Sequence, residues 1–143
     1  NFDLLNTNYN FQEHIKFLEE KVKNEKTICK ILMDQKLFPG VGNYIKSEAL
    51  FTSKIHPEEK WINISDEKRK KLIKTTKKIM HQSLKSGGAE LKDFKNPFHK
   101  SKFKLKVYGQ KLTPDKNIIQ SILTSDKRKS WICLKSQKLT PED

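Results

Sequence analysis

The sequence predicts a mainly α-helical unit followed by a small antiparallel β-hairpin. Three observations favour this fold class. Apolar residues recur at helical spacing through most of the first 86 residues, a proline and two glycines interrupt that pattern at residues 39–42, and two β-rich runs flank a polar turn near the C-terminus. We expect a boundary between residues 88 and 105, which divides the chain into a helical unit (1–95) and a hairpin unit (96–143).

Three shorter helices are expected in the first unit. The first covers residues 11–22, the second residues 26–37 with Thr27 as a possible N-cap, and the third about residues 44–53. The third helix must end before Pro57, because the residue preceding a proline is biased away from helical angles. The expected inward positions are Phe11, Ile15, Leu18, Val22, Ile28, Ile31, Leu32, Ile45, Ala49 and Leu50.

The longest helix is expected over residues 65–86, with an acidic first turn and Gly87-Gly88 at its end. Its opposite face is rich in lysine, for which a solvated surface is the simplest interpretation. Its expected apolar stripe contains Leu72, Ile73, Thr76, Ile79, Met80, Ser83 and Leu84.

Residues 118–123 and 130–134 are rich in β-branched and aromatic residues and flank the polar turn at residues 125–128. This arrangement predicts a β-hairpin. A single hairpin of this size is too small to be stable by itself, so it must pack against another part of the protein.

The charge is strongly one-sided: 30 Lys and Arg stand against 17 Asp and Glu, a net charge of +13. Such a surplus indicates a polyanionic partner, with nucleic acid first and an anionic membrane second, although a solubility device remains an alternative. No apolar run is long enough to span a membrane and no signal peptide is visible, so we expect no membrane association. The two distant cysteines, Cys29 and Cys133, indicate reduced thiols in an intracellular protein, nuclear or cytoplasmic.

The interruption at residues 37–44, Leu-Phe-Pro-Gly-Val-Gly-Asn-Tyr, is the candidate binding site. Glycines permit unusual backbone angles, and the helix that follows presents free N–H groups at its positive end, which suits a phosphate. A plain helix-turn-helix corner is the structural alternative. The candidate DNA-binding residues here are Gly40, Val41, Gly42, Asn43 and Lys46. Both the helix-hairpin-helix and the helix–two-turn–helix (H2TH) architecture fit this local pattern.

Residues 31–61 closely resemble the H2TH segment of the formamidopyrimidine-DNA glycosylase and endonuclease VIII family. The resemblance continues in residues 86–94 (Ser-Gly-Gly-Ala-Glu-Leu-Lys-Asp-Phe) and 107–110 (Val-Tyr-Gly-Gln), the second of which looks like the start of the family's zinc finger. The matching positions in the first segment are Leu32, Asp34, Gln35, Gly40 to Asn43, Glu48, Leu50, Phe51 and Ile55 to Pro57. The resemblance implies an H2TH domain with a finger, and a role in base-excision repair as a DNA glycosylase and AP lyase acting on oxidised bases.

The finger departs from the family pattern. The family's four cysteine ligands fall near Asp115 and Ile118 and on Cys133 and Ser136, so one of four ligands survives. We therefore expect no zinc and no other cofactor, and the hairpin resembles the zincless finger of some endonuclease VIII-like members. The resemblance makes Arg128 the finger-tip arginine that grips phosphates, with Lys127 adding attraction. The expected apolar core of the hairpin is Ile118, Ile122, Trp131 and Leu134.

The second departure concerns catalysis. The family uses an N-terminal proline as nucleophile, whereas this chain begins Asn1-Phe2-Asp3 and shows no resemblance before residue 31 to that N-terminal domain. We therefore expect no catalytic residue in this chain, which would hold damaged double-stranded DNA beside a separate N-terminal catalytic domain. The alternative function is a noncatalytic H2TH nucleic-acid-binding module. A lysine-rich membrane-surface protein is disfavoured, because no Trp- or Phe-lined apolar face supports it.

Overall fold

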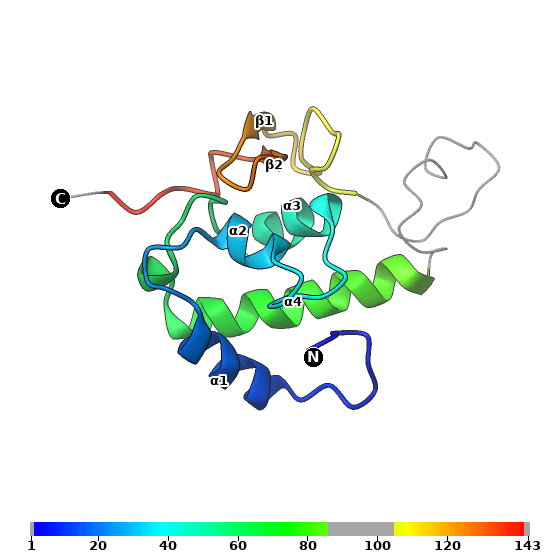
Figure 1. Ribbon diagram of the computed structural model, residues 1–143. Coiled ribbons are helices and arrows are strands. Elements are labelled where there is room, and N and C mark those ends of the chain that lie inside the picture. The colour runs from blue at the N-terminus through cyan, green and yellow to red at the C-terminus, as the bar shows by residue number, and fades with distance from the viewer. Residues whose placement is uncertain (1, 86–104, 142–143) are drawn as a thin grey trace.

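The computed structural model describes residues 2–85 and 105–141 and confirms the predicted fold class (Figure 1). The predicted boundary near residues 88–105 and the matching stretch 86–94 lie outside the described residues. Four α-helices, a short 3-10 turn at Trp61–Asn63 and two strands form the described part. Their bounds are α1 Phe11–Lys21, α2 Ile28–Met33, α3 Asn43–Thr52, α4 Asp66–Lys85, β1 Gln120–Leu123 and β2 Lys129–Ile132.

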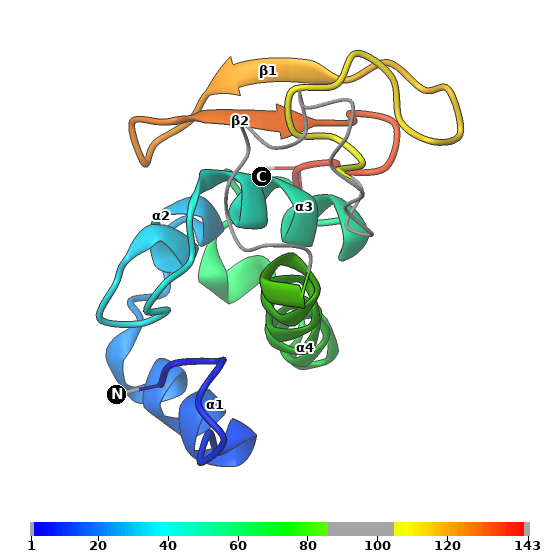
Figure 2. The same cartoon turned by 90° about the vertical axis from the view of Figure 1, so that its right-hand side faces the viewer.

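Helix α3 lies at the centre of the fold. It packs against α4 on one side and against β2 on the other, and α2 lies beside it. Figure 2 shows the resulting layers, with the hairpin above α3, α4 beneath it and α1 at the far end. Because neighbours cover α3 from both sides, residues 43–50 are all buried, including four polar or charged ones that the amphipathic pattern did not place inside.

Helix α1 confirms the predicted apolar face. Asn10 caps it, since the Asn10 side-chain oxygen accepts a 3.0 Å hydrogen bond from the Glu13 amide. Ile15, Leu18 and Val22 are buried in the main core.

Helix α2 is shorter than the predicted helix 26–37. Asp34 ends it: the Asp34 carbonyl accepts hydrogen bonds from the amides of Leu37 and Phe38, and its side chain accepts one from the Lys36 amide. These bonds form a turn in place of a further helical turn. Thr27 is at the N-cap position, but its side chain makes no capping bond.

Helix α4 follows its predicted bounds closely and is described to Lys85. Its N-terminus is capped by Ser65, whose hydroxyl accepts from the Lys68 amide at 3.2 Å. The stripe predicted for it is buried from Leu72 to Ser83. Leu84 was wrongly included, since it is 59% exposed.

The hairpin has the predicted strands, but its buried residues agree with the predicted core only in part. Strands β1 and β2 pair antiparallel, with Ile122 opposite Ser130. The predicted core was wrong at Ile118 and Leu134, which are 72% and 44% exposed, whereas Ser130 and Ile132 are buried. Strand β2 presents Ser130 and Ile132 to α3, because side chains alternate along a strand.

Trp131 points the other way along β2. It is half-buried, and its ring lies against the Tyr108 ring with centroids 4.4 Å apart. Apolar packing therefore covers one side of the hairpin, while the side that faces α3 is partly polar.

Candidate nucleic-acid interface

The turn between α2 and α3 is shaped by one glycine and one glutamine. Gly40 has φ +84°, a left-handed conformation that disfavours side chains. The Gln35 side chain spans the turn, since its carbonyl oxygen accepts from the Gly40 amide at 2.8 Å and its amide donates to the Val41 carbonyl at 3.0 Å. Gln35 therefore stabilises the turn and occupies the Gly40 amide, which is not available to a ligand.

Helix α3 begins at this turn with no side chain over its end. Its N-cap is Gly42, which offers no capping side chain. The amide groups of a first helical turn have no partner within their own helix, and together with the helix dipole they attract anions. Gly40 is exposed and Gly42 half-buried, whereas Val41 is 2% exposed and belongs to the core. The accessible part of the turn is therefore its glycine backbone.

Asn43 connects this turn to the hairpin. It is buried, and its side-chain nitrogen donates to the Lys129 carbonyl at 2.8 Å. Its side-chain oxygen has no hydrogen-bond partner among the described residues. Because an amide nitrogen carries two hydrogens, Asn43 retains one further donor after the bond to Lys129.

Lys46, a candidate DNA-binding residue in the sequence analysis, does not lie on the surface. Its side chain is fully buried, and its ammonium lies 2.6 Å from a carboxylate oxygen of Asp126 at the hairpin tip. Burial lowers the pKa of the Lys46 ammonium, opposed by the hydrogen bond to Asp126. Burial would raise the pKa of Asp126, but the Lys46 ammonium and the Thr124 hydroxyl outweigh it and hold that pKa below its usual value. The pair is thus an internal connection between α3 and the tip.

The hairpin tip is closed by Thr124. The Thr124 amide donates to the Arg128 carbonyl, and its hydroxyl lies 2.8 Å from that of Ser130. Lys127 has φ +65° within this turn. Lys127 and Arg128 are both exposed, so the tip presents two cations on a backbone that its neighbours hold in place.

A second set of contacts holds the other side of the tip. The Glu58 carboxylate accepts from the amide and the hydroxyl of Ser125, at 3.1 and 2.6 Å. The Ser125 hydroxyl also lies 2.7 Å from that of Thr27, at the start of α2. Burial would raise the pKa of Glu58, but these bonds from Ser125 dominate and lower it. The tip is therefore tied to α2 as well as to α3.

Glu48 anchors the segment that leads into the hairpin. Its carboxylate is 2% exposed and accepts hydrogen bonds from the amides of Lys106, Val107 and Tyr108 at 2.6 to 2.8 Å. Burial raises the pKa of this carboxyl, while the three amide bonds work in the other direction. These bonds explain structurally why a glutamate stands at this position of a buried helix.

The positions that match a zinc site do not form one. Asp115 and Ile118 are exposed, an isoleucine offers no ligand atom, and Cys133 is buried with a free thiol. Within the described ranges, no group of three or more His, Cys, Asp or Glu side chains is placed to hold a metal ion. Gln137 connects this region instead: its side chain accepts from the Cys133 amide and donates to the Ile55 carbonyl, each at 2.9 Å.

The structure therefore brings the predicted site residues of the turn and of the hairpin together, in different roles. Gly40, Gly42, Lys127 and Arg128 reach solvent, while Val41, Asn43 and Lys46 are buried. The Ser47 hydroxyl in α3 also supports the hairpin, because it accepts from the Trp131 amide at 3.2 Å. The supporting residues that sequence reasoning missed are thus Gln35, Ser47, Glu58, Asp126 and Thr124. Of the residues that support the site, only Gln35 and Glu48 could have been found from the sequence, because both are positions that match the H2TH segment of the family. No helix in residues 2–85 or 105–141 is long and apolar enough to cross a bilayer.

Comparison with known proteins identifies similar chains. A family model described as the formamidopyrimidine-DNA glycosylase H2TH domain matches residues 6–95. The formamidopyrimidine-DNA glycosylase of Klebsiella pneumoniae subsp. pneumoniae is 39% identical over 102 residues, covering 68% of this chain and 38% of the relative. That of Enterobacter sp. (strain 638) is 34% identical over 128 residues, covering 85% of this chain and 48% of the relative.

Solved structures show the same fold. The crystal structure of a viral DNA glycosylase has a TM-score of 0.80 and 26% identity, covering 95% of this chain and 49% of that one. Lactococcus lactis Fpg in complex with abasic-site DNA has a TM-score of 0.78 and 23% identity, covering 95% and 51%. The chain thus spans about half the length, or less, of the relatives it matches.

Proposed function

The chain belongs to the formamidopyrimidine-DNA glycosylase H2TH domain family, and on this basis we propose that it is the DNA-holding part of a base-excision-repair DNA glycosylase and AP lyase. Its partner in this proposal is damaged double-stranded DNA, and its substrates are oxidised bases. The phosphate backbone supplies most of the attraction, in keeping with the net charge of +13.

One observation carries the proposal: the turn and the hairpin tip form one connected unit. Asn43, the first residue of α3, donates to the Lys129 carbonyl, one residue from Arg128. Lys46, one turn further along α3, binds Asp126 two residues before Arg128. The two candidate phosphate contacts are therefore held at a set distance from each other before any DNA binds, which reduces the entropic cost of binding.

The roles we propose differ from residue to residue. The backbone amides of Gly42 and of the first turn of α3 would bind one phosphate group, and the Arg128 guanidinium would bind another on the damaged strand in bidentate fashion. Asn43 would act by holding the hairpin through the Lys129 carbonyl. Lys127 would add attraction that does not depend on sequence. Lys46 would act through Asp126, by holding the tip in place.

Bond cleavage, in this proposal, belongs to the N-terminal part of the relatives that this chain does not cover. The relatives are named as glycosylases, and this chain covers 38% to 48% of their length in the two comparisons above. We also propose the division into a helical unit (1–95) and a hairpin unit (96–143), which the Glu48 and Lys46 contacts join.

Two measurements test the proposal. Fluorescence anisotropy with a duplex that contains an abasic-site analogue should show an affinity loss of about tenfold or more for Arg128→Ala, because a charge-assisted contact contributes about 1.5–3 kcal/mol. Lys135→Ala, an exposed cation on the same unit, is the matched control and should change affinity only slightly. Equal affinity of Arg128→Ala and wild type for the lesion would overturn the assignment.

Borohydride trapping on abasic-site DNA tests the division of labour. The chain alone should give no covalent product, and addition of the N-terminal domain of a relative should restore trapping. Trapping by the chain alone would place the nucleophile here. Intact DNA binding without trapping in either mixture would favour a noncatalytic H2TH module.

A further inference from the structure

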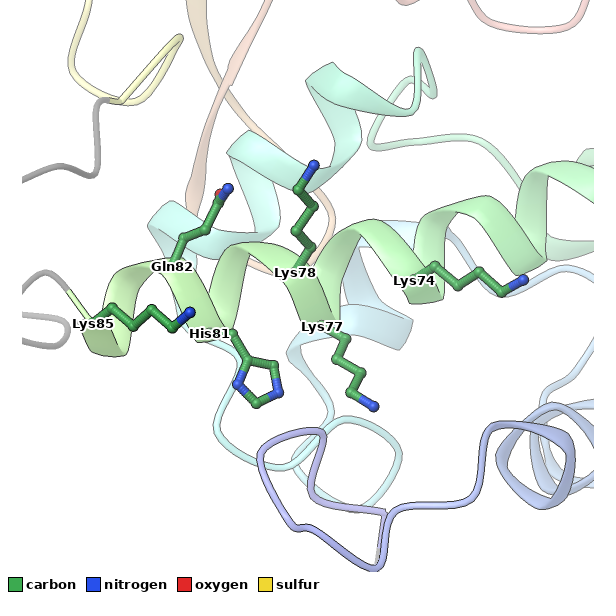
Figure 3. A pocket seen from close by; sticks show the side chains of 6 residues that line it. All are labelled: Lys74, Lys77, Lys78, His81, Gln82 and Lys85. Atoms are coloured by element: carbon green, nitrogen blue, oxygen red, sulfur yellow. The ribbon is translucent and has the colours of Figure 1, made fainter.

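The outer face of α4 carries a dense cluster of cations around a shallow hollow of about 410 Å³. Figure 3 shows the side chains that line it, all projecting from about three turns of this helix. They are Lys74, Lys77, Lys78, His81, Gln82 and Lys85. We call this set the α4 basic face.

Among the described residues, no carboxylate forms an ion pair with a lysine of the α4 basic face. The acidic residues of α4, Asp66 and Glu67, lie in its first turn, and Lys70–Asp66 is the one ion pair that α4 makes within the described residues. Lys74 and Lys78 are spaced i,i+4, and such like-charged neighbours repel each other. The stability of the isolated helix does not explain this arrangement, and an anionic partner does.

Aromatic rings from the N-terminal part of the chain hold two of these cations in position. The Lys74 ammonium lies 4.9 Å from the centroid of the Phe11 ring, and the Lys77 ammonium lies 4.9 Å from that of Tyr9. Cation–π contacts of this kind limit the freedom of a lysine side chain while leaving its charge intact. The face is therefore partly ordered before binding, unlike a set of free surface lysines.

The α4 basic face points away from the proposed DNA site. The apolar stripe of α4, including Leu72 and Thr76, is buried on the side where the helix packs against α3. The lysines lie on the opposite side of α4. Figures 1 and 3 view the molecule from opposite sides: the C-terminal end of α4 lies at the right in Figure 1, whereas Lys85 at that end lies at the left in Figure 3. The side chains labelled in Figure 3 are therefore on the side of α4 that faces away from the viewer in Figure 1.

We propose that the α4 basic face is a second binding surface for the DNA backbone, which engages a DNA segment other than the one held by the turn and the hairpin tip. The identification of the polyanion as DNA rests on the proposed function. A membrane surface fits less well, because an interfacial helix buries an apolar face in lipid and the apolar face of α4 is already buried in protein.

The variant Lys74→Gln/Lys78→Gln tests this surface without disturbing the helix, because glutamine has a similar helix propensity. Its matched control is Lys16→Gln/Lys21→Gln, which removes the same charge from exposed positions of α1. With undamaged duplex, loss of two phosphate contacts should reduce the slope of log affinity against log salt by about 1.8. The control should keep a slope near that of wild type.

A bridging assay separates the two sites. Two duplexes with different fluorophores should show energy transfer when monomeric wild-type chain is added, and the α4 variant should lose this signal while keeping its affinity for abasic-analogue DNA. If the α4 variant matches the control in both slope and bridging, the α4 surface is refuted. If Arg128→Ala instead leaves lesion binding unchanged, the assignment of Arg128 fails, and the α4 surface is still judged by its own slope and bridging results. Amide NMR shifts of residues 74–85 on titration of wild type with undamaged duplex give a readout that needs no variant.

Discussion

Replacement of Lys46 by methionine removes the buried ammonium and keeps most of the side-chain volume. In the native protein the Lys46 and Asp126 side chains are 0% and 3% exposed, with 2.6 Å between the ammonium and the carboxylate. The variant leaves the Asp126 carboxylate with the Thr124 hydroxyl, which donates to it at 2.5 Å, as its main remaining partner. Breaking one half of a buried ion pair in this way typically costs about 3–5 kcal/mol.

The cost of protonating Asp126 in the variant gives a similar loss of stability. Asp126 can avoid a buried charge by taking up a proton, which at pH 7 costs about 4 kcal/mol for a carboxyl of ordinary pKa 3.8, at about 1.4 kcal/mol per pH unit. This cost falls to roughly 1.6 kcal/mol at pH 5. Native Asp126 has a lowered pKa, so the stability from the ion pair is present above the ordinary pKa and is lost as the pH falls through the lowered value. Both effects reduce the difference in free energy of unfolding between variant and wild type as the pH falls.

Urea unfolding followed by tryptophan fluorescence measures this cost, because Trp131 lies in β2 against Tyr108 and reports on docking of the hairpin. Lys46→Met should lose several kcal/mol at pH 7 and clearly less at pH 5. Lys46→Met/Asp126→Asn should recover much of the loss, and Lys127→Met, an exposed neighbour, should change stability by less than about 0.5 kcal/mol. A cost below about 1 kcal/mol at pH 7, or one that is equal at both pH values, would refute the buried ion pair.

Three further perturbations test the supporting structure. Gly40→Ala should destabilise the protein by about 1–2 kcal/mol in urea unfolding, because residue 40 has a φ of +84°. Gly42→Ala should change the stability little, because a Cβ added at this position meets open space. Glu48→Gln should lower the melting temperature by several degrees in calorimetry, because a single amide oxygen cannot accept all three backbone bonds and each unpaired amide costs about 1–3 kcal/mol. His14 is buried against the Leu37 carbonyl, and burial lowers its pKa below 6.5, so stability should fall as the pH drops below that value; His14→Gln should flatten this part of the pH profile measured by unfolding.

Local pattern was sufficient for the secondary structure and for the turn. Apolar spacing placed α1 and α4 close to their observed bounds, because one buried face per helix imposes a period near 3.6 residues. The glycine turn before α3 and Pro57 after it limited the bounds of α3 instead. The glycines at positions 40 and 42 predicted a turn here, and Gly40 has positive φ. That this turn binds a phosphate stays a prediction. The end of α2 was missed because it depends on Asp34 competing for backbone amides, a signal that apolar periodicity does not contain.

The sequence by itself determined that a helical unit, a glycine turn and a β-hairpin exist, since each depends on neighbours within a few residues. Only the tertiary structure decided which side of the hairpin is buried and that Lys46 is an internal residue. The partner of Lys46 stands 80 positions away, and that of Asn43 stands 86 away. A lysine next to a glycine turn looks like a surface cation until the fold places a carboxylate beside it and excludes water from both, because burial and pairing are properties of distant segments that meet in space.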